Sequence, residues 1–252
     1  MFFGQWRGAR SVSIEDVSAR PGGPIAVAAV YTSKEGDRIV PAASLLLYGP
    51  NGRLRAAFAL SPLRQIRKLV VDESSNIWTL TENFDEGDPL AVPMVVEYSA
   101  EGEVVREELP RNVLWSHGIP PKEGMYSGRI TMGSGAGVVW IWLPGLTDLV
   151  TISASDGKVT IVQTGLPARE KYREDPLDVA REPSGNVVGV FREDGDKGQS
   201  ELAYYAWSPS TKVWSQFRPG PCDGERLLGI GNAGQIYQGF GDRQGDICAF
   251  GK

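Results

Sequence analysis

Short apolar segments alternate with tight polar turns along the whole chain. Four of the turns can be aligned with one another: Tyr48-Gly-Pro-Asn-Gly-Arg53, Tyr98-Ser-Ala-Glu-Gly-Glu103, Ser153-Ala-Ser-Asp-Gly-Lys158 and Trp207-Ser-Pro-Ser-Thr-Lys212. Each lies between two apolar strands, and successive copies are 50 to 55 residues apart. A repeat of this length that contains several short strands is typical of a β-propeller, in which each repeat forms one blade.

A second set of landmarks gives the number of blades. Strands opened by a small or amide residue precede the turns at Gly23-Pro-Ile-Ala-Val27, Asn76-Ile-Trp-Thr-Leu80, Gly137-Val-Val-Trp-Ile-Trp142, Asn186-Val-Val-Gly-Val-Phe191 and Gly234-Gln-Ile-Tyr-Gln-Gly-Phe240. Each copy holds four expected strands, which in the second blade span roughly 66–72, 76–82, 93–98 and 103–109. No segment keeps a helical period over three turns. The pattern predicts an all-β fold, a single propeller domain over residues 1–252 with five four-stranded blades.

The fifth copy lacks an outer strand, because the chain ends shortly after Asp246-Ile-Cys-Ala-Phe250. The N-terminus offers a spare strand, Phe2-Phe-Gly-Gln-Trp6, ahead of the first inner strand at 10–15. Pairing the two would close the ring and remove exposed strand edges. The alternative is a six-bladed propeller that lacks one blade.

One repeat resembles a known family. Val70-Val-Asp-Glu-Ser-Ser-Asn-Ile-Trp78, followed by Val95-Val-Glu-Tyr-Ser-Ala-Glu-Gly-Glu103, is similar to a repeat of the NHL and TolB-like propellers, and Arg181-Glu-Pro-Ser-Gly-Asn186 repeats its middle part. The resemblance implies a propeller fold, and an extracytoplasmic location is an expectation from it alone. The shared residues are turn formers. They therefore specify a fold and leave the function open.

Composition narrows the classes of partner. The chain is 41% hydrophobic, with seven Trp and eight each of Tyr and Phe, which is ample for a folded core. The net charge of −5 is spread over both signs, so no basic face for nucleic acid is expected. No apolar run approaches the ~18 residues of a membrane-spanning helix, so membrane insertion is not expected and the chain reads as soluble.

The two cysteines, Cys222 and Cys248, both fall in the last blade. Cys222 is expected to enter the inner strand and Cys248 to lie in the third strand, with one strand between them. Strands separated by a neighbour lie ~9.5 Å apart, beyond the ~7 Å Cα limit for a disulfide. Two buried thiols are the first expectation, and a bridge formed by a folded-over loop is the alternative.

Loop length points to one face. Turns between first and second strands and between third and fourth strands are short. Longer segments are expected between second and third strands, at 34–43, 83–92 and 192–200, and between blades, at 111–128 and 168–175. In a propeller these two classes emerge on the same face, and loops on a rigid scaffold commonly carry binding.

The longest such segment provides the candidate ligand-binding cluster. It holds Trp115, Tyr126 and the single histidine, His117, and it leads to Arg129 at the start of the third inner strand. Aromatic surfaces beside a cation suit an anionic or sugar-like ligand. The structural alternative is that Trp115 fills the channel mouth and His117 is a solvated loop residue.

Two aspartates near the fourth inner strand complete the set of candidate ligand-binding residues. Asp175 and Asp178 lie at the entrance to that strand, where capping a turn is the competing role.

Metal and catalytic chemistry find little support. The acidic segments Asp85-Glu-Gly-Asp88 and Glu193-Asp-Gly-Asp196 resemble parts of calcium loops but complete no ligand set. One histidine cannot build a histidine metal site. A glycosidase would need two facing carboxylates, for which Asp175 or Asp178 with Glu225 are the available residues. No metal, cofactor or catalytic residue is therefore assigned.

The sequence thus favours a non-enzymatic propeller. Its long-loop face is expected to bind an unidentified small molecule or protein. The alternative function is a small-molecule hydrolase or lyase, similar to a lactonase, that acts at the mouth of the central channel.

Overall fold

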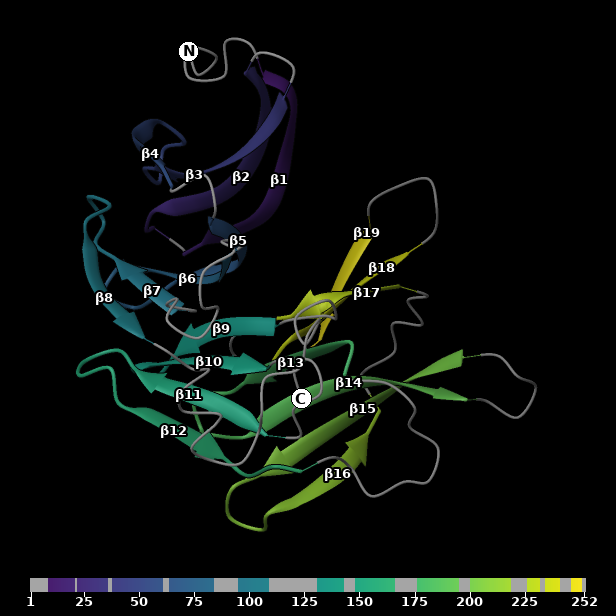
Figure 1. Ribbon diagram of the computed structural model, residues 1–252. Helices are drawn as coiled ribbons and strands as arrows, with labels where there is room; N and C mark the ends of the chain where they lie inside the picture. Colours follow the sequence, from purple (N-terminus) through teal and green to yellow (C-terminus); the bar gives the residue numbers. More distant parts are fainter. Residues whose placement is uncertain are drawn as a thin grey trace. The chain divides into compact units, whose positions relative to one another are not determined.

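All regular structure in the described part of the chain is β-strand (Figure 1). The computed structural model describes residues 9–20, 22–35, 38–60, 64–83, 95–108, 131–142, 148–165, 176–194, 200–218, 226–231, 234–240 and 246–250. These residues form five antiparallel sheets, four of them four-stranded, and within each sheet the strands follow chain order. Such meanders are propeller blades. The predicted all-β propeller with five blades is confirmed.

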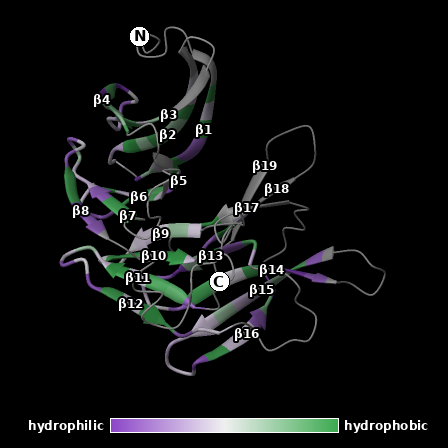
Figure 2. Cartoon of the chain, viewed as in Figure 1, coloured by the Kyte–Doolittle hydropathy of each residue, from purple (hydrophilic) through white to green (hydrophobic). Residues whose placement is uncertain are grey.

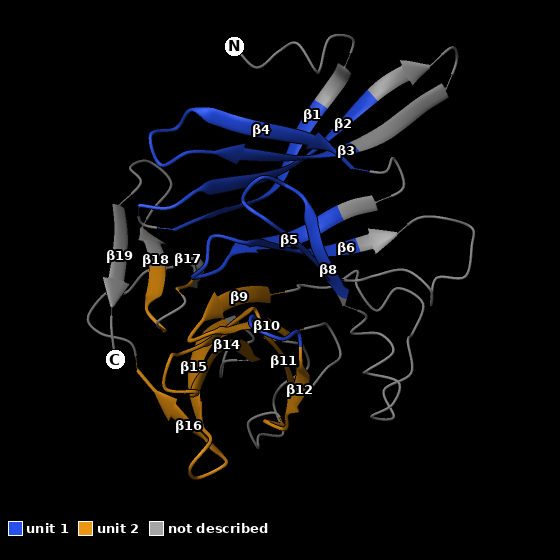
Figure 3. Ribbon diagram, turned by 90° about the vertical axis from the view of Figure 1, so that its left-hand side faces the viewer, with its two compact units in different colours: residues 1–121, 154–157 blue, residues 122–153, 158–252 orange. Residues whose placement is uncertain are grey.

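The chain divides into two compact units, coloured separately in Figure 3. Unit 1 comprises residues 1–121 and 154–157, and unit 2 comprises residues 122–153 and 158–252. The strands of unit 1 are β1 (Ala9–Ala19), β2 (Ile25–Glu35), β3 (Arg38–Tyr48) and β4 (Leu54–Ala59) in the first blade, and β5 (Arg64–Val71), β6 (Ile77–Asn83), β7 (Val95–Tyr98) and β8 (Val104–Glu108) in the second. The second-blade strands lie where the sequence pattern predicts them.

Unit 2 holds the other three blades. Its strands are β9 (Thr131–Gly135), β10 (Val138–Trp142), β11 (Leu149–Ser153) and β12 (Val159–Val162), then β13 (Asp178–Arg181), β14 (Val187–Asp194), β15 (Ser200–Ser208) and β16 (Val213–Phe217), and finally β17 (Arg226–Ile230), β18 (Ile236–Phe240) and β19 (Asp246–Phe250). Cys248 lies in β19, the third strand of its blade, as expected. Cys222 and the proposed closing strand at residues 2–6 lie outside the described residues, so the thiol state and ring closure stay predictions.

One of the expected long loops is wrong, and the ends of another lie in strands. Residues 34–43 were expected to form a loop, but β2 and β3 pair as far as Glu35 and Arg38. Pro41 is accepted in β3 because β4 reaches only to Ser44, so no neighbour on that side requires its missing N–H. The strands β14 and β15 pair out to Asp194 and Ser200, which places residues 192–194 and 200 of the expected loop 192–200 in strands, and 195–199 lie outside the described residues.

The middle strands of each blade form its core. Figure 2 shows hydrophobic colour concentrated along β10, β11 and β14. In unit 1, side chains of the first blade such as Leu45 and Leu47 pack against Leu69, Ile77 and others of the second. In unit 2, a tryptophan-rich cluster joins the third and fourth blades, with Trp140, Trp142, Trp207 and Val179 among its members. Each blade therefore depends on a neighbour to cover its apolar face.

Hydrogen bonds between inner strands fix the stagger of neighbouring blades. Asp16 of β1 accepts a hydrogen bond from the backbone N–H of Leu69 in β5 at 2.9 Å. The Ser18 hydroxyl oxygen accepts a hydrogen bond from the backbone N–H of Val71 at 3.1 Å. A bulge between Ile14 and Asp16 brings both side chains to the face that meets β5. In unit 2, Asp178 of β13 accepts the N–H of Ile230 in β17 at 2.8 Å. The same device thus occurs twice, once in each unit.

The short turns take the conformations that their sequences predict. Gly52 and Gly102 lie at matching positions of two third-to-fourth-strand turns, with φ of 71° and 86°, and each donates its N–H to a carbonyl three residues earlier at 2.9 Å. Their surroundings differ. A Cβ on Gly102 would lie 1.9 Å from Cζ of Phe58, whereas one on Gly52 would meet nothing within 4 Å.

This difference makes a matched pair of substitutions informative. Gly52→Ala should cost about 1 kcal/mol of unfolding free energy, since only the left-handed backbone opposes it. Gly102→Ala should cost about 2 to 4 kcal/mol, because the added methyl also displaces Phe58 from the packing between the blades. Denaturant midpoints of both variants and the wild type measure the gap. Equal losses would show that Phe58 does not pack as described.

Candidate functional site

Strand order places the connecting segments at two opposite ends of each blade. Because all four strands alternate in direction, first-to-second and third-to-fourth turns share one end, here called the turn end. Second-to-third connections and links to the next blade share the other end, here called the loop end. The longest link, between β8 and β9, spans residues 109–130, and the link between β12 and β13 spans 163–177.

Most residues of the predicted cluster lie outside the described residues. Trp115, His117, Tyr126 and Arg129 belong to 109–130, and Asp175 belongs to 166–175. Their proposed role in binding stays a prediction.

Asp178 is described, and both of its oxygens accept backbone hydrogen bonds. Oδ1 accepts the N–H of Val179 at 2.9 Å, and Oδ2 accepts that of Ile230 at 2.8 Å. It opens β13 at the loop end, as expected, and the contacts seen there hold two inner strands together.

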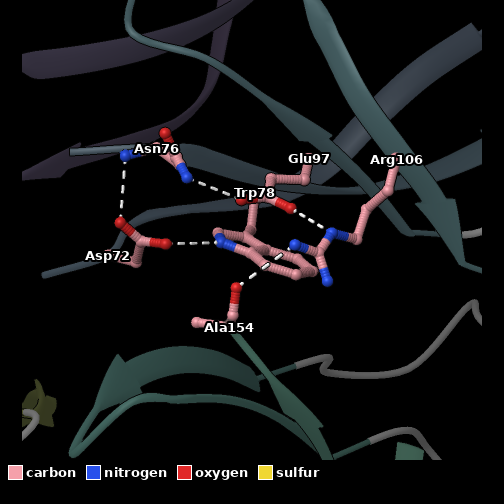
Figure 4. A network of polar contacts seen from close by, with 6 residues as sticks. All are labelled: Asp72, Asn76, Trp78, Glu97, Arg106 and Ala154. Atoms are coloured by element: carbon pink, nitrogen blue, oxygen red, sulfur yellow. Dashed lines mark hydrogen bonds and ion pairs between the residues drawn. The ribbon is translucent and has the colours of Figure 1, made fainter. Parts of the chain in front are cut away.

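A row of paired polar side chains crosses the second blade. Trp78, Glu97 and Arg106 are direct cross-strand partners on β6, β7 and β8, so they share one face of the sheet. Figure 4 shows how they meet. Glu97 accepts a hydrogen bond from the Asn76 side-chain amide at 2.6 Å and forms an ion pair with the Arg106 guanidinium at 2.5 Å. The Arg106 guanidinium lies over the Trp78 ring, 5.7 Å from its centroid.

Asp72 completes this network at the turn before β6. Its Oδ1 accepts the N–H groups of Ser74 and Asn76, and its Oδ2 accepts the indole N–H of Trp78 at 2.9 Å. Arg106 extends the network to the turn at 154–157, where it donates to the Ala154 carbonyl at 3.3 Å. The Asp, Asn and Trp of the family-like motif are thus structural, since each is used within the blade.

Burial perturbs the carboxyl at the centre of the network. Glu97 is only 1% exposed, and this burial raises its pKa above the usual value, with the charge of Arg106 opposing the shift. The carboxylate is enclosed by its protein partners. It therefore acts as a link between β7 and β8 and not as a base open to a substrate.

The described acidic groups form no metal centre. No group of three or more His, Cys, Asp or Glu side chains in the described ranges is arranged to hold an ion. Glu193, from one of the suspected calcium segments, lies in β14 and accepts the Tyr205 hydroxyl at 2.8 Å. Asp85–Asp88 and Glu225 lie outside the described residues.

The third and fourth blades, within unit 2, differ from the second blade because they contain buried hydrogen-bond donors that lack partners among the described residues. Apart from Glu97, the described side chains hold five buried polar atoms without a hydrogen-bond partner, and all five come from these two blades: Thr131 Oγ1, Trp140 Nε1, Trp142 Nε1, Arg181 Nη1 and Trp207 Nε1. All five can donate and four can only donate. Buried indole N–H groups normally find an acceptor, so this concentration calls for a physical explanation.

A neighbouring tryptophan shows the ordinary arrangement. Trp214 of β16 packs against the same cluster, and its indole N–H reaches the carbonyls of Thr164 and Gly165 at 3.0 and 3.1 Å. The unpartnered donors are therefore specific to certain positions of the interface.

Two of the donors lie at the loop end of the third blade. Thr131 is the first residue of β9, Trp142 is the last of β10, and the two are direct cross-strand partners. They are 8% and 1% exposed, and Trp142 packs in the cluster shared with the fourth blade. The structure thus places a buried hydroxyl and a buried indole N–H, both lacking an acceptor among the described residues, directly beside the longest link.

Comparisons with known proteins add information on the fold alone. No protein-family model and no curated protein sequence matches the chain. Similar solved structures include a protein of unknown function from Bacteroides caccae, 14% identical, covering 93% of this chain and 74% of that one, with a TM-score of 0.47. A candidate exported protein from Bacteroides fragilis is 8% identical over 90% of this chain and 66% of that chain, with a TM-score of 0.52. An α-L-arabinofuranosidase from Podospora anserina is 11% identical over 99% and 93%, with a TM-score of 0.44.

The raised pKa of Glu97 predicts a specific pH dependence. Between its usual value of 4.5 and the raised value, the folded state binds more protons than the unfolded state. The unfolding free energy contributed by Glu97 is therefore present below this window and lost as the pH rises through it. Relative to Glu97→Gln, the wild type should lose stability as the pH rises from about 4.5 and then level off.

Denaturant unfolding at a series of pH values measures this difference. Glu101→Gln, which removes a carboxylate at an exposed turn position, is the matched control. Parallel curves for wild type and Glu97→Gln would contradict the assignment.

Proposed function

We propose that this protein is a non-enzymatic β-propeller that binds a polar ligand at the loop end of its third blade. The observation that supports this most is the pair of buried, unpartnered donors, Thr131 and Trp142. Leaving such groups without an acceptor costs about 1 to 3 kcal/mol each. A ligand oxygen that accepts from both would recover that free energy on binding.

The donors define the chemistry of the ligand. An indole N–H can only donate, and a threonine hydroxyl can donate as well, so the complementary group is an acceptor oxygen. The proposal extends to the residues that the sequence predicts to bind a ligand, which are Trp115, His117, Tyr126, Arg129 and Asp175. Aromatic surfaces with a cation suit an anionic or sugar-like molecule, which offers acceptor oxygens of this kind.

The carboxylates favour binding over catalysis. Hydrolases and lyases of sugars and lactones need carboxylates or metals that face a substrate. Asp72, Glu97, Asp178 and Glu193 instead accept bonds that hold strands and turns together. A hydrolase or lyase remains the alternative function, and turnover in the experiment below would establish it.

Partners and location form part of the same proposal. The net charge of −5 argues against nucleic acid as the ligand. None of the described residues forms a helix that could cross a membrane. The candidate exported protein among the similar structures supports an extracytoplasmic location.

Two substitutions that remove a single donor each test the site. Thr131→Val removes its donor at nearly constant volume, and Trp142→Phe removes the indole N–H while keeping an aromatic ring. Each should weaken ligand binding about 5- to 10-fold, since one hydrogen bond contributes about 1 kcal/mol. Thr131→Val should leave stability nearly unchanged, because no protein acceptor is lost. Trp142→Phe should lose about 1 to 2 kcal/mol, because the smaller ring leaves a cavity at a buried position. Thermal shift with glucose, arabinose, gluconate and glucuronate, followed by calorimetry on the best ligand, measures both effects.

Trp214→Phe is the matched control. Its indole N–H has carbonyl acceptors in the protein, so this variant should lose about 1 kcal/mol of stability and keep the wild-type affinity. If Thr131→Val and Trp142→Phe bind as the wild type does, the proposed site is wrong. Hydrolysis of lactone or glycoside substrates by the wild type would contradict the non-enzymatic part alone.

A further inference from the structure

The fourth blade contains a half-buried cation that has no counter-ion among the described residues. Arg181 is the last residue of β13, and its Nη1 is buried and has no partner among the described residues. Burial lowers the pKa of the Arg181 guanidinium below its usual value, and no described acidic group offsets that shift. Buried charges in proteins are normally paired, because burying an unpaired one is costly.

The nearest acidic residue in the sequence is already engaged elsewhere. Glu182 follows Arg181 directly, yet its carboxylate accepts the Asn186 amide at 2.9 Å and the Ser184 hydroxyl at 3.2 Å. It also lies against Gly234 in the turn of the fifth blade, where an added Cβ would come within 2.6 Å of it. Arg181 is therefore left without this carboxylate.

A second donor lies on the same face of the blade. Arg181 pairs with Val187 across β13 and β14, and Val187 pairs with Trp207 across β14 and β15, so all three side chains share one face. Trp207 is 4% exposed, and its indole N–H has no acceptor among the described residues. An Arg181 nitrogen lies 3.7 Å from where a Cβ on Gly185 would stand, which places the guanidinium at the turn end.

We propose that Arg181 and Trp207 form a binding site for a compact oxyanion, a carboxylate or phosphate group, at the turn end of the fourth blade. The guanidinium supplies the charge and two parallel N–H donors, and the indole supplies a neutral donor. An oxyanion accepts from both, whereas a water molecule would leave the charge of the half-buried guanidinium uncompensated. This site lies at the opposite end of the blades from the Thr131 and Trp142 donors and does not rest on them.

Anion-dependent stability tests the proposal on the intact protein. The wild type is melted in inorganic phosphate, sulfate, acetate or chloride at one ionic strength and at pH 7. Phosphate, sulfate or acetate should raise the melting temperature over chloride in a saturable manner, because a ligand that binds the folded state stabilises it by mass action. The ranking of phosphate against acetate identifies whether the natural group is a phosphate or a carboxylate.

Three variants locate the effect. Arg181→Met should abolish the anion response, and Trp207→Phe should weaken anion affinity about 5-fold, the equivalent of one neutral hydrogen bond. Arg218→Met removes an exposed arginine and should keep the full response. If Arg181→Met does not fold, Trp207→Phe and the wild-type titration still decide the matter.

Two results would overturn the site. One is a wild-type melting temperature that is the same in all four salts, which would mean that the Arg181 guanidinium does not bind an oxyanion. The other is an anion response that survives in Arg181→Met or is unchanged in Trp207→Phe. Loss of this response with unaltered sugar binding would separate the site from the proposed ligand site of the third blade.

Discussion

The hydrogen bond that a carboxylate on one inner strand accepts from the backbone N–H of the next inner strand sets the geometry on which the rest of each unit depends. Asp16 makes this bond to Leu69, and Asp178 makes it to Ile230. It fixes how far one blade is shifted along its neighbour, and this shift decides which side chains meet between them. Asp16 is also held by Lys68 at 3.7 Å, which offsets part of the burial that raises the pKa of its carboxyl.

This use of carboxylates separates the polar groups of the protein into two kinds. Acceptors are engaged in structure, as Asp72, Glu97 and Asp178 illustrate. The surplus in the third and fourth blades consists of donors, three of which are indole N–H groups. These acceptors already bind backbone and turn donors, so the remaining buried donors are complementary to molecules rich in acceptor oxygen. This complementarity underlies both proposed sites.

The sequence carries much of the fold because turn chemistry is local. Asp72, Asn76 and Trp78 could be read as a blade motif, since an aspartate that accepts turn N–H groups forms its bonds within a few residues. The first-blade hairpin at 34–43 could not be read in the same way. Pro41 by itself indicates a loop. It is compatible with a strand only because β4 stops short of it, and the length of a neighbouring strand is not encoded in the local sequence.

The buried donors of the candidate sites could not be predicted from the sequence for a related reason. Trp142 and Trp207 lie in apolar strands and read as core, as does the Trp78 that has its acceptor in Asp72. Whether an indole N–H meets an oxygen depends on the groups packed around it, which include its own blade for Trp78 and the carbonyls of Thr164 and Gly165 for Trp214. Only the assembled interface distinguishes a satisfied tryptophan from an unsatisfied one, while the residues that the sequence did single out, Trp115, His117, Tyr126 and Arg129, lie in the link outside the described residues.

The most direct measurement is the proton chemical shift of the indole N–H groups in protein labelled with nitrogen-15 tryptophan. Hydrogen bonding deshields this proton, so bonded and unbonded indoles separate, and Trp→Phe variants assign the signals. The account predicts that Trp78 and Trp214 resonate as bonded, that Trp142 and Trp207 resonate as unbonded in ligand-free protein, and that ligand moves Trp142 to the bonded range. Bonded shifts for Trp142 and Trp207 without ligand would contradict the donor surplus on which both sites rest.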